Sequence, residues 1–222
     1  MRRVDVTHRW AGNAGTFGEF DADSTFGDSL VVDGVSYTFP VGGATMIVGD
    51  NTDGSALFTT ACVYGGPSNT LDDCGNVNAG ITNGGVMVGA AYDFDNGFTV
   101  ATGFAGSEKD GIFSEESTDA YGINGAYTGD NFGVSVTYGV VEATSGTPAT
   151  LTGEEDTYTA FNAYYTPEGL PSISVGYEIG DIGGADAAVD EKESFFVGLT
   201  MDDIGPGSIG VALGHSDTIE GS

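Results

Sequence analysis

A repeating unit that occupies residues 84–214 constrains the fold of this chain more than any other feature. Each unit has about ten residues in which apolar side chains alternate with small or polar ones, and the connection that follows is in turn very short or long. Val86, Val88 and Ala90 fall on one face of the first unit. A period of two is that of a β-strand. The pattern recurs in eight segments, at residues 86–94, 98–104, 121–127, 132–140, 159–165, 173–179, 195–201 and 209–213.

The connections between these segments favour a membrane barrel over a soluble sandwich. Tight turns rich in Asp, Asn, Gly and Pro lie at residues 95–97, 129–130, 167–169 and 203–207. Long acidic stretches separate them, at residues 106–118, 142–156 and 180–193. Transmembrane barrels have short turns at one end and long loops at the other. The predicted fold class is therefore all-β, an antiparallel up-and-down transmembrane β-barrel.

The part of the chain before the repeat is less regular. Residues 4–10 are a candidate strand, and residues 13–28 are expected to be a polar, Gly-rich loop. Residues 35–39 and 44–48 predict a hairpin, and the region from Cys62 to Cys74 predicts a long loop. The whole chain, residues 1–222, is then a single barrel domain of roughly ten to twelve strands.

Composition supports a barrel with a polar interior. The chain has 38 Gly, and Gly at alternating strand positions suits a crowded or water-facing inner wall. Ser172, Ser174, Gly176 and Glu178 form such a face, which a water-filled lumen tolerates. Aromatic residues gather near the short turns, as in a membrane-interface girdle; a soluble core would also bury them. They are Tyr92, Phe94, Phe98, Tyr127, Phe132, Tyr164 and Tyr165.

The charge balance excludes one class of partner. With 33 acidic against 5 basic residues, the formal net charge is −28, so no Lys or Arg patch exists to bind nucleic acid. The acids concentrate in the long stretches, where they either solvate exposed loops or form a negative mouth that attracts cations. They include Glu108, Asp110, Glu115, Glu116, Glu154, Glu155, Asp156, Asp181, Asp186, Asp190, Glu191 and Glu193.

Cys62 and Cys74 are the only cysteines, and they flank a turn-rich segment. An even pair around a small loop predicts a disulfide in an oxidising compartment. A metal site is disfavoured because His8 and His215 are far away in sequence and no second close pair completes a ligand set. No cofactor is expected.

Three stretches resemble the barrel of cyanobacterial outer-membrane porins, a group similar to the carbohydrate-selective porins. They are residues 35–42 (VSYTFPVG), 119–134 (DAYGINGAYTGDNFGV) and 196–212 (FVGLTMDDIGPGSIGVA). The resemblance implies passive diffusion of small hydrophilic solutes, inorganic ions or sugars, across an outer membrane. It also implies contact with outer-membrane lipid and a homotrimer. Because the charges fall almost wholly on the side of the long stretches, we expect the acidic long loops outside the cell and the short turns on the periplasmic side.

The same resemblance implies an N-terminal envelope-anchoring domain and further strands after the barrel segment. We therefore expect this sequence to be a fragment that lacks both, and an incomplete barrel would have unpaired edges.

Two other function classes have weaker support in the sequence. No nucleophile motif accompanies the two histidines, so an enzyme is not expected. A secreted or surface β-rich adhesin or calcium-binding module is the alternative, although the Gly-Gly-x-Gly-x-Asp calcium repeat does not recur. For a pore, Arg2, Arg3 and Arg9 are candidate lining charges if the first strand faces the lumen; otherwise they are terminal or loop charges.

Overall fold

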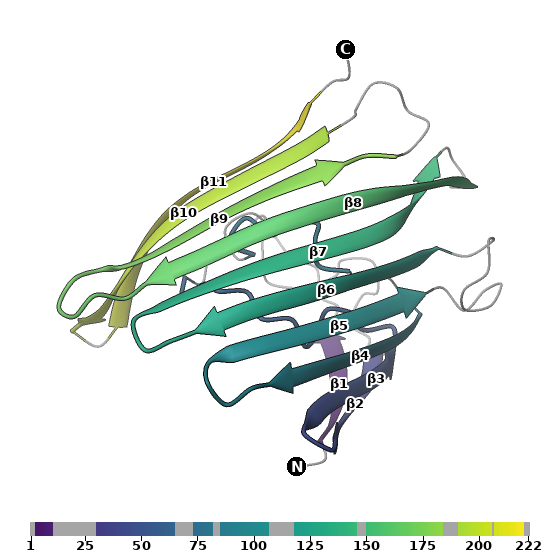
Figure 1. Ribbon diagram of the computed structural model, residues 1–222, viewed down its shortest axis with the longest axis horizontal. Coiled ribbons are helices and arrows are strands. Elements are labelled where there is room, and N and C mark those ends of the chain that lie inside the picture. Colours follow the sequence, from purple (N-terminus) through teal and green to yellow (C-terminus); the bar gives the residue numbers. More distant parts are fainter. Residues whose placement is uncertain are drawn as a thin grey trace.

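The computed structural model describes residues 3–10, 30–64, 73–81, 85–106, 118–145, 150–183, 191–205 and 207–219. These residues form eleven strands in one sheet (Figure 1). The strands are β1 Arg3–Trp10, β2 Leu30–Val41, β3 Ala44–Asp50, β4 Val86–Asp93, β5 Phe98–Gly106, β6 Asp119–Thr128, β7 Phe132–Ser145, β8 Thr150–Tyr165, β9 Ser172–Asp181, β10 Glu191–Ile204 and β11 Gly207–Ile219.

Each strand pairs antiparallel with the next one along the chain, so the sheet order is β1 to β11 without a crossover. The sheet curves into a wall that does not close on itself, because β1 and β11 lie at its two ends. This confirms the predicted all-β, antiparallel up-and-down class, and the eight repeat segments correspond to β4 to β11, the first of them extending one residue past the end of β4. Among the described residues, no helix is long and apolar enough to cross a membrane.

Short and long connections alternate as predicted, with one correction. The turns at Gly42, Gly97, Gly169 and Gly205 use positive φ angles of 60, 88, 71 and 64°, which Gly adopts without strain. Residues 142–156, however, are mostly strand, since β7 continues to Ser145 and β8 begins at Thr150. Glu142 pairs with Glu155 in this extension. The acidic residues do not end these strands, because the backbones of β7 and β8 remain hydrogen-bonded to each other there.

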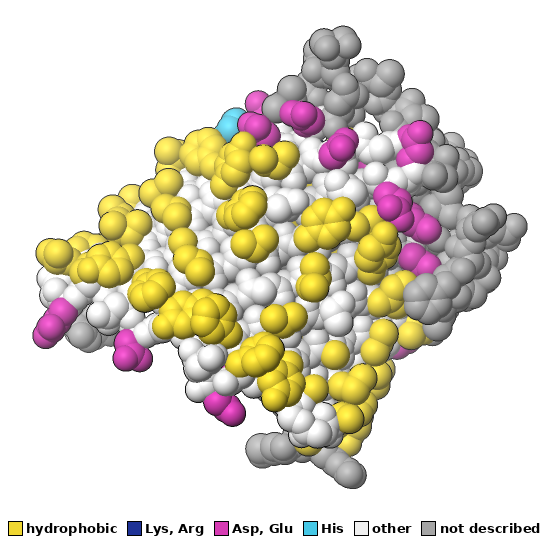
Figure 2. All heavy atoms as spheres, viewed as in Figure 1, with side chains coloured by type: hydrophobic (Ala, Val, Ile, Leu, Met, Phe, Trp, Pro, Cys, Tyr) yellow, Lys and Arg dark blue, Asp and Glu magenta, His cyan; other side chains and the backbone are white. Residues whose placement is uncertain are grey.

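The convex face of the wall is apolar. Ile123, Val134, Phe161 and Val197 point outward and are 53, 49, 49 and 46% exposed. Figure 2 shows a broad hydrophobic field on this face; most of the Asp and Glu in the view lie along the edge with the long connections, and a few stand at the short-turn end. A field of this size needs an apolar environment, since soluble monomers rarely expose contiguous patches larger than a few hundred Å².

Aromatic rings mark both ends of the apolar field. At the short-turn end, Phe98 lies 4.8 Å from Tyr127 and Tyr127 lies 5.2 Å from Phe132, measured between ring centroids. At the other end, the Tyr121 hydroxyl donates to Glu155 (3.1 Å) and the Tyr177 hydroxyl donates to Glu193 (3.0 Å). This second row of outward tyrosines was not predicted.

Tyr164 does not belong to the outward row in which the sequence analysis placed it. It shares the inward face with Asn162, two residues earlier, and its hydroxyl donates to the Gly129 carbonyl (3.1 Å) across the short-turn end. Successive residues of a strand face opposite sides of the sheet, and Tyr165 is outward and 53% exposed, so Tyr164 faces inward.

Candidate functional site

The connection between β3 and β4, residues 51–85, is called here the inner segment, and its described part lies against the concave face of the wall. Its described residues are 51–64, 73–81 and 85. In Figure 1 it passes behind β6 to β9. Sequence analysis placed a long loop around Cys62 and Cys74, but it did not predict that the loop folds onto the inside of the sheet.

The first limb of the inner segment, residues 58–64, binds the wall through alternate backbone N–H groups. The N–H of Thr59 donates to Asn124 Oδ1 (2.9 Å), that of Ala61 to Ser135 Oγ (2.9 Å) and that of Val63 to Ser174 Oγ (3.1 Å). Asn124 also donates back to the Thr59 carbonyl (3.1 Å) and to Thr137 (2.8 Å), which stands on the neighbouring strand. The acceptors come from β6, β7 and β9, so this limb crosses several strands.

The second limb, residues 73–81, runs back over β8, β9 and β10. Asn162 Nδ2 donates to the Cys74 carbonyl (2.7 Å), and the Ser194 hydroxyl donates to the Gly75 carbonyl (2.6 Å). The backbone N–H groups of Asn78 and Ala79 donate to the carboxylate of Glu178. The wall residues in these bonds are almost wholly buried, which makes each bond costly to leave unmade.

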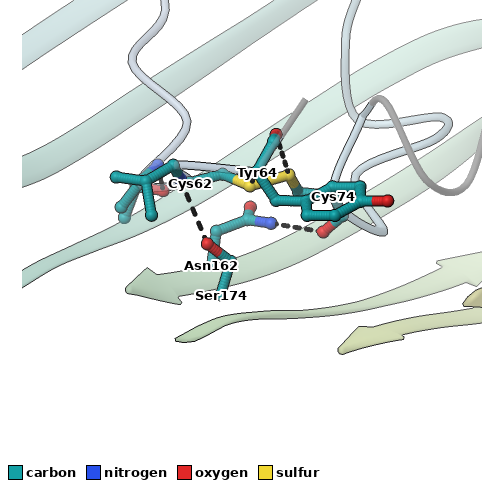
Figure 3. Close-up of a disulfide and its surroundings, with 8 residues drawn as sticks. Cys62, Tyr64, Cys74, Asn162 and Ser174 are labelled. Atoms are coloured by element: carbon teal, nitrogen blue, oxygen red, sulfur yellow. Dashed lines mark hydrogen bonds between the residues drawn. A yellow bond between two sulfur atoms is a disulfide. The ribbon is translucent and has the colours of Figure 1, made fainter. Parts of the chain in front are cut away.

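A disulfide between Cys62 and Cys74 joins the two limbs (Figure 3). The Tyr64 carbonyl oxygen lies 3.5 Å from both sulfur atoms, and the Asn162 amide points toward the Cys74 carbonyl in the same view. The disulfide therefore joins the two limbs at the same place where Ser174 and Asn162 of the wall bind them.

Glycines on the inward face let the inner segment lie directly on the wall. A Cβ at Gly176 would collide with the Cys74 carbonyl oxygen, and one at Gly103 would collide with that of Gly54. At Gly139 it would come within 2.8 Å of the Ala79 carbonyl oxygen. The Gly-rich inner face was expected to be crowded or water-facing, and along this path it is crowded.

The two limbs, together with residues 53–56, line an open pocket of about 490 Å³. Asp53, Thr60, Tyr64, Asp73 and Asn76 are among its lining residues. The described residues contain no group of three or more His, Cys, Asp or Glu side chains placed to hold a metal ion. Carboxylate, hydroxyl and amide groups instead give the pocket a polar lining that suits hydrated solutes.

The predicted charges at the long-connection end lie partly in strands. Glu155 is in β8, and Glu191 and Glu193 are in β10. On the inward side of this edge, Lys192 Nζ lies 3.5 Å from the Tyr158 hydroxyl and 5.8 Å from the centroid of its ring. Some of the predicted loop acids lie outside the described residues: Glu108, Asp110, Glu115, Glu116, Asp186 and Asp190.

The three arginines are placed only in part. Arg3 and Arg9 lie in β1, but their side chains, and Arg2 as a whole, are outside the described part of the structure. A pore-lining role for them stays a prediction.

The functional residues that sequence reasoning missed are the buried anchors Asn124, Ser135, Asn162, Ser174, Glu178 and Ser194. Sequence reasoning assigned the face of β9 that carries Ser174 and Glu178 to water, yet each is 1% exposed because the inner segment covers it. A signal was present in the polar and Gly residues at inward positions of consecutive strands, together with a cysteine pair in a connection of matching length.

No protein-family model and no curated protein matches the sequence, so no match supports a cyanobacterial origin or a carbohydrate-selective family. Among solved structures, 26 chains match. One, a porin refined at 1.8 Å resolution, aligns with a TM-score of 0.56 at 15% identity, over 88% of this chain. The chain spans 60% of the length of that porin. At this identity the likeness establishes the fold, which is a porin-type antiparallel β-sheet.

Proposed function

We propose that this chain forms the wall of an outer-membrane pore through which small hydrophilic solutes diffuse passively. The single observation that carries the proposal is the arrangement of the two faces of the sheet. The convex face is a continuous apolar field, while the concave face has mostly small and polar side chains, apart from a few buried apolar ones such as Met87 and Phe196, and carries an inner segment with a polar pocket. A pore wall needs lipid contact on one side and water on the other.

The height of the outward face is compatible with contact with lipid. On β8 this face runs from Glu155 at the charged edge to Tyr165 at the short-turn end, ten residue steps, or ~33 Å at ~3.3 Å per residue. For a strand tilted by ~40° from the membrane normal, this corresponds to about 25 Å from edge to edge, which is an upper limit for the apolar field; the apolar band of such barrels is about 25 Å tall.

The inner segment is proposed to narrow the lumen and to limit the size of the solutes. Backbone groups fixed to the wall present a polar surface without catalytic chemistry, so we propose a channel and not an enzyme. Inorganic ions and sugars are the proposed solutes. Because Glu155, Asp181 and Glu191 stand at the long-connection edge, we expect cations to be favoured over anions at low salt.

We propose that the edge with the long connections faces outside and the short turns face the periplasm. A homotrimer is the proposed assembly, by analogy with porins.

Reconstitution of the full-length protein in planar bilayers tests the proposal. Stepwise increases of current in KCl are expected, and their absence with protein that has inserted would refute the pore. Partitioning addresses the adhesin alternative: a soluble adhesin module would stay monodisperse without detergent, whereas this wall requires detergent or lipid because of its apolar field.

A further inference from the structure

Glu178 is a buried carboxylate at the centre of the contact between wall and inner segment. It projects inward from β9, and it is 1% exposed. Its cross-strand partners are Ala160 on β8 and Ser194 on β10, both of them small. A carboxylate so placed needs hydrogen-bond donors, because burial of an unpaired charge is strongly unfavourable.

All the donors that the structure gives this carboxylate come from the inner segment. The Asn78 backbone N–H lies 3.0 and 2.9 Å from its two oxygens, Asn78 Nδ2 lies 2.7 Å from Oε1, and the Ala79 N–H lies 2.8 Å from Oε2. Both oxygens are engaged, so Glu178 meets the peptide backbone of the second limb and not the solutes in the lumen.

The other described anchors of the inner segment are neutral. Asn124, Ser135, Asn162, Ser174 and Ser194 form ordinary amide or hydroxyl hydrogen bonds with the segment. Hydrogen bonds to an ionised group are shorter and roughly twice as strong. Glu178 therefore holds its part of the second limb more firmly than a neutral side chain would.

From this geometry we propose that Glu178 is a positioning residue that fixes the distance between the second limb and the wall, and thereby sets the upper size limit for solutes. The inference rests on the proposed function, since it names the residue that determines selectivity by size in the same pore. The part of the limb it holds adjoins Asn76 and Val77, which line the pocket between the two limbs.

The test uses Glu178→Gln and Glu178→Ala in the full chain, with Glu168→Gln at an exposed short turn as the matched control. Gln keeps one oxygen acceptor but turns an NH₂ group toward the backbone donors, and Ala removes both acceptors. Hydrogen exchange of the Asn78 and Ala79 amides is expected to accelerate in the order wild type, Gln, Ala. Strand amides should keep their wild-type rates.

In planar bilayers, both variants should show increased open-channel current noise, and the largest neutral polymer that enters the pore should become larger. Faster exchange of the Asn78 and Ala79 amides with an unchanged polymer cutoff would overturn the proposed control of size. Unchanged exchange would overturn the anchoring itself. Absence of conductance in the wild type would refute the pore, while the exchange measurement would still report on the anchor.

Asn78→Asp changes the same contact on the side of the inner segment. It tests the proposal even if the Glu178 variants fail to fold. It places a second carboxylate where Nδ2 donates to Glu178 Oε1, so repulsion should loosen the limb without altering the wall. Wild-type exchange and an unchanged polymer cutoff in this variant would overturn the proposal.

Discussion

Gly176 allows the closest approach between the inner segment and the wall, so Gly176→Ala is a sharp test of that contact. The added methyl group would collide with the Cys74 carbonyl oxygen, which must retreat by more than about 1 Å to reach a normal van der Waals separation. Asn162 Nδ2 donates to this same oxygen at 2.7 Å, and the retreat breaks that bond. Asn162 is 4% exposed, so its amide is then left without its acceptor in a buried site.

The magnitude follows from these two effects. A buried polar group that loses its partner costs about 1–3 kcal/mol, and overpacking costs about 1–3 kcal/mol. Because the retreat relieves part of the overpacking, we expect local detachment of residues 73–81 to become easier by about 2–4 kcal/mol. At ~1.4 kcal/mol per factor of ten, this is an increase of about 30- to 1,000-fold in the opening equilibrium.

Hydrogen exchange of a peptide that covers residues 73–81 measures this equilibrium directly. Gly125→Ala is the matched control, since Gly125 lies in β6 and a Cβ there would meet nothing within 4 Å. Exchange should accelerate in Gly176→Ala and stay at the wild-type rate in Gly125→Ala. Equal rates in the two variants would refute the reasoning that this glycine is required by the inner segment.

Three other perturbations address the disulfide, the lipid face and the charged edge. The double variant Cys62→Ala/Cys74→Ala should lose about 3 kcal/mol of unfolding free energy in detergent, on the chain-entropy model; an unchanged denaturation midpoint would contradict this. Ile123→Arg should weaken folding into lipid vesicles by about 2–4 kcal/mol, against about 0–1 for Ile173→Arg, which lies on the same outward face near a short turn. Equal losses would argue against a membrane-spanning β6. The double variant Glu155→Gln/Glu191→Gln should lower the preference for cations in reversal-potential measurements at low salt. An unchanged reversal potential would show that these two carboxylates do not contribute to ion selectivity.

The strands could be predicted because successive residues face opposite sides of the sheet, so the period of two in the sequence shows which face each residue occupies. That is why β4 to β11 follow the sequence pattern closely and why eleven strands fall within the predicted number. The prediction was wrong at residues 142–156, where β7 and β8 extend past the apolar field. The acidic residues in this stretch indicate that it lies outside the apolar field, but they do not indicate whether its backbone is paired in a sheet.

The inner segment could not be predicted by the same reasoning. Its described backbone pairs mainly with side chains of β6 to β10, so it carries no period that reveals its partners. Asn124 and Glu178 are separated from their bonding partners by 65 and 100 residues. Their burial becomes evident only once the curved sheet and the disulfide place the segment on the concave face.

The anchors of the inner segment also bear on the assembly of the wall. Asn124, Ser135, Asn162, Ser174 and Glu178 stand on four different strands, and each must face inward for its bond to form. A slip of one residue in any of these strands would turn its anchor toward the convex face and leave its partner on the segment unsatisfied, at a cost of about 1–3 kcal/mol for each lost bond. The inner segment therefore stabilises the correct strand register, because every misaligned strand would lose its hydrogen bond to the segment.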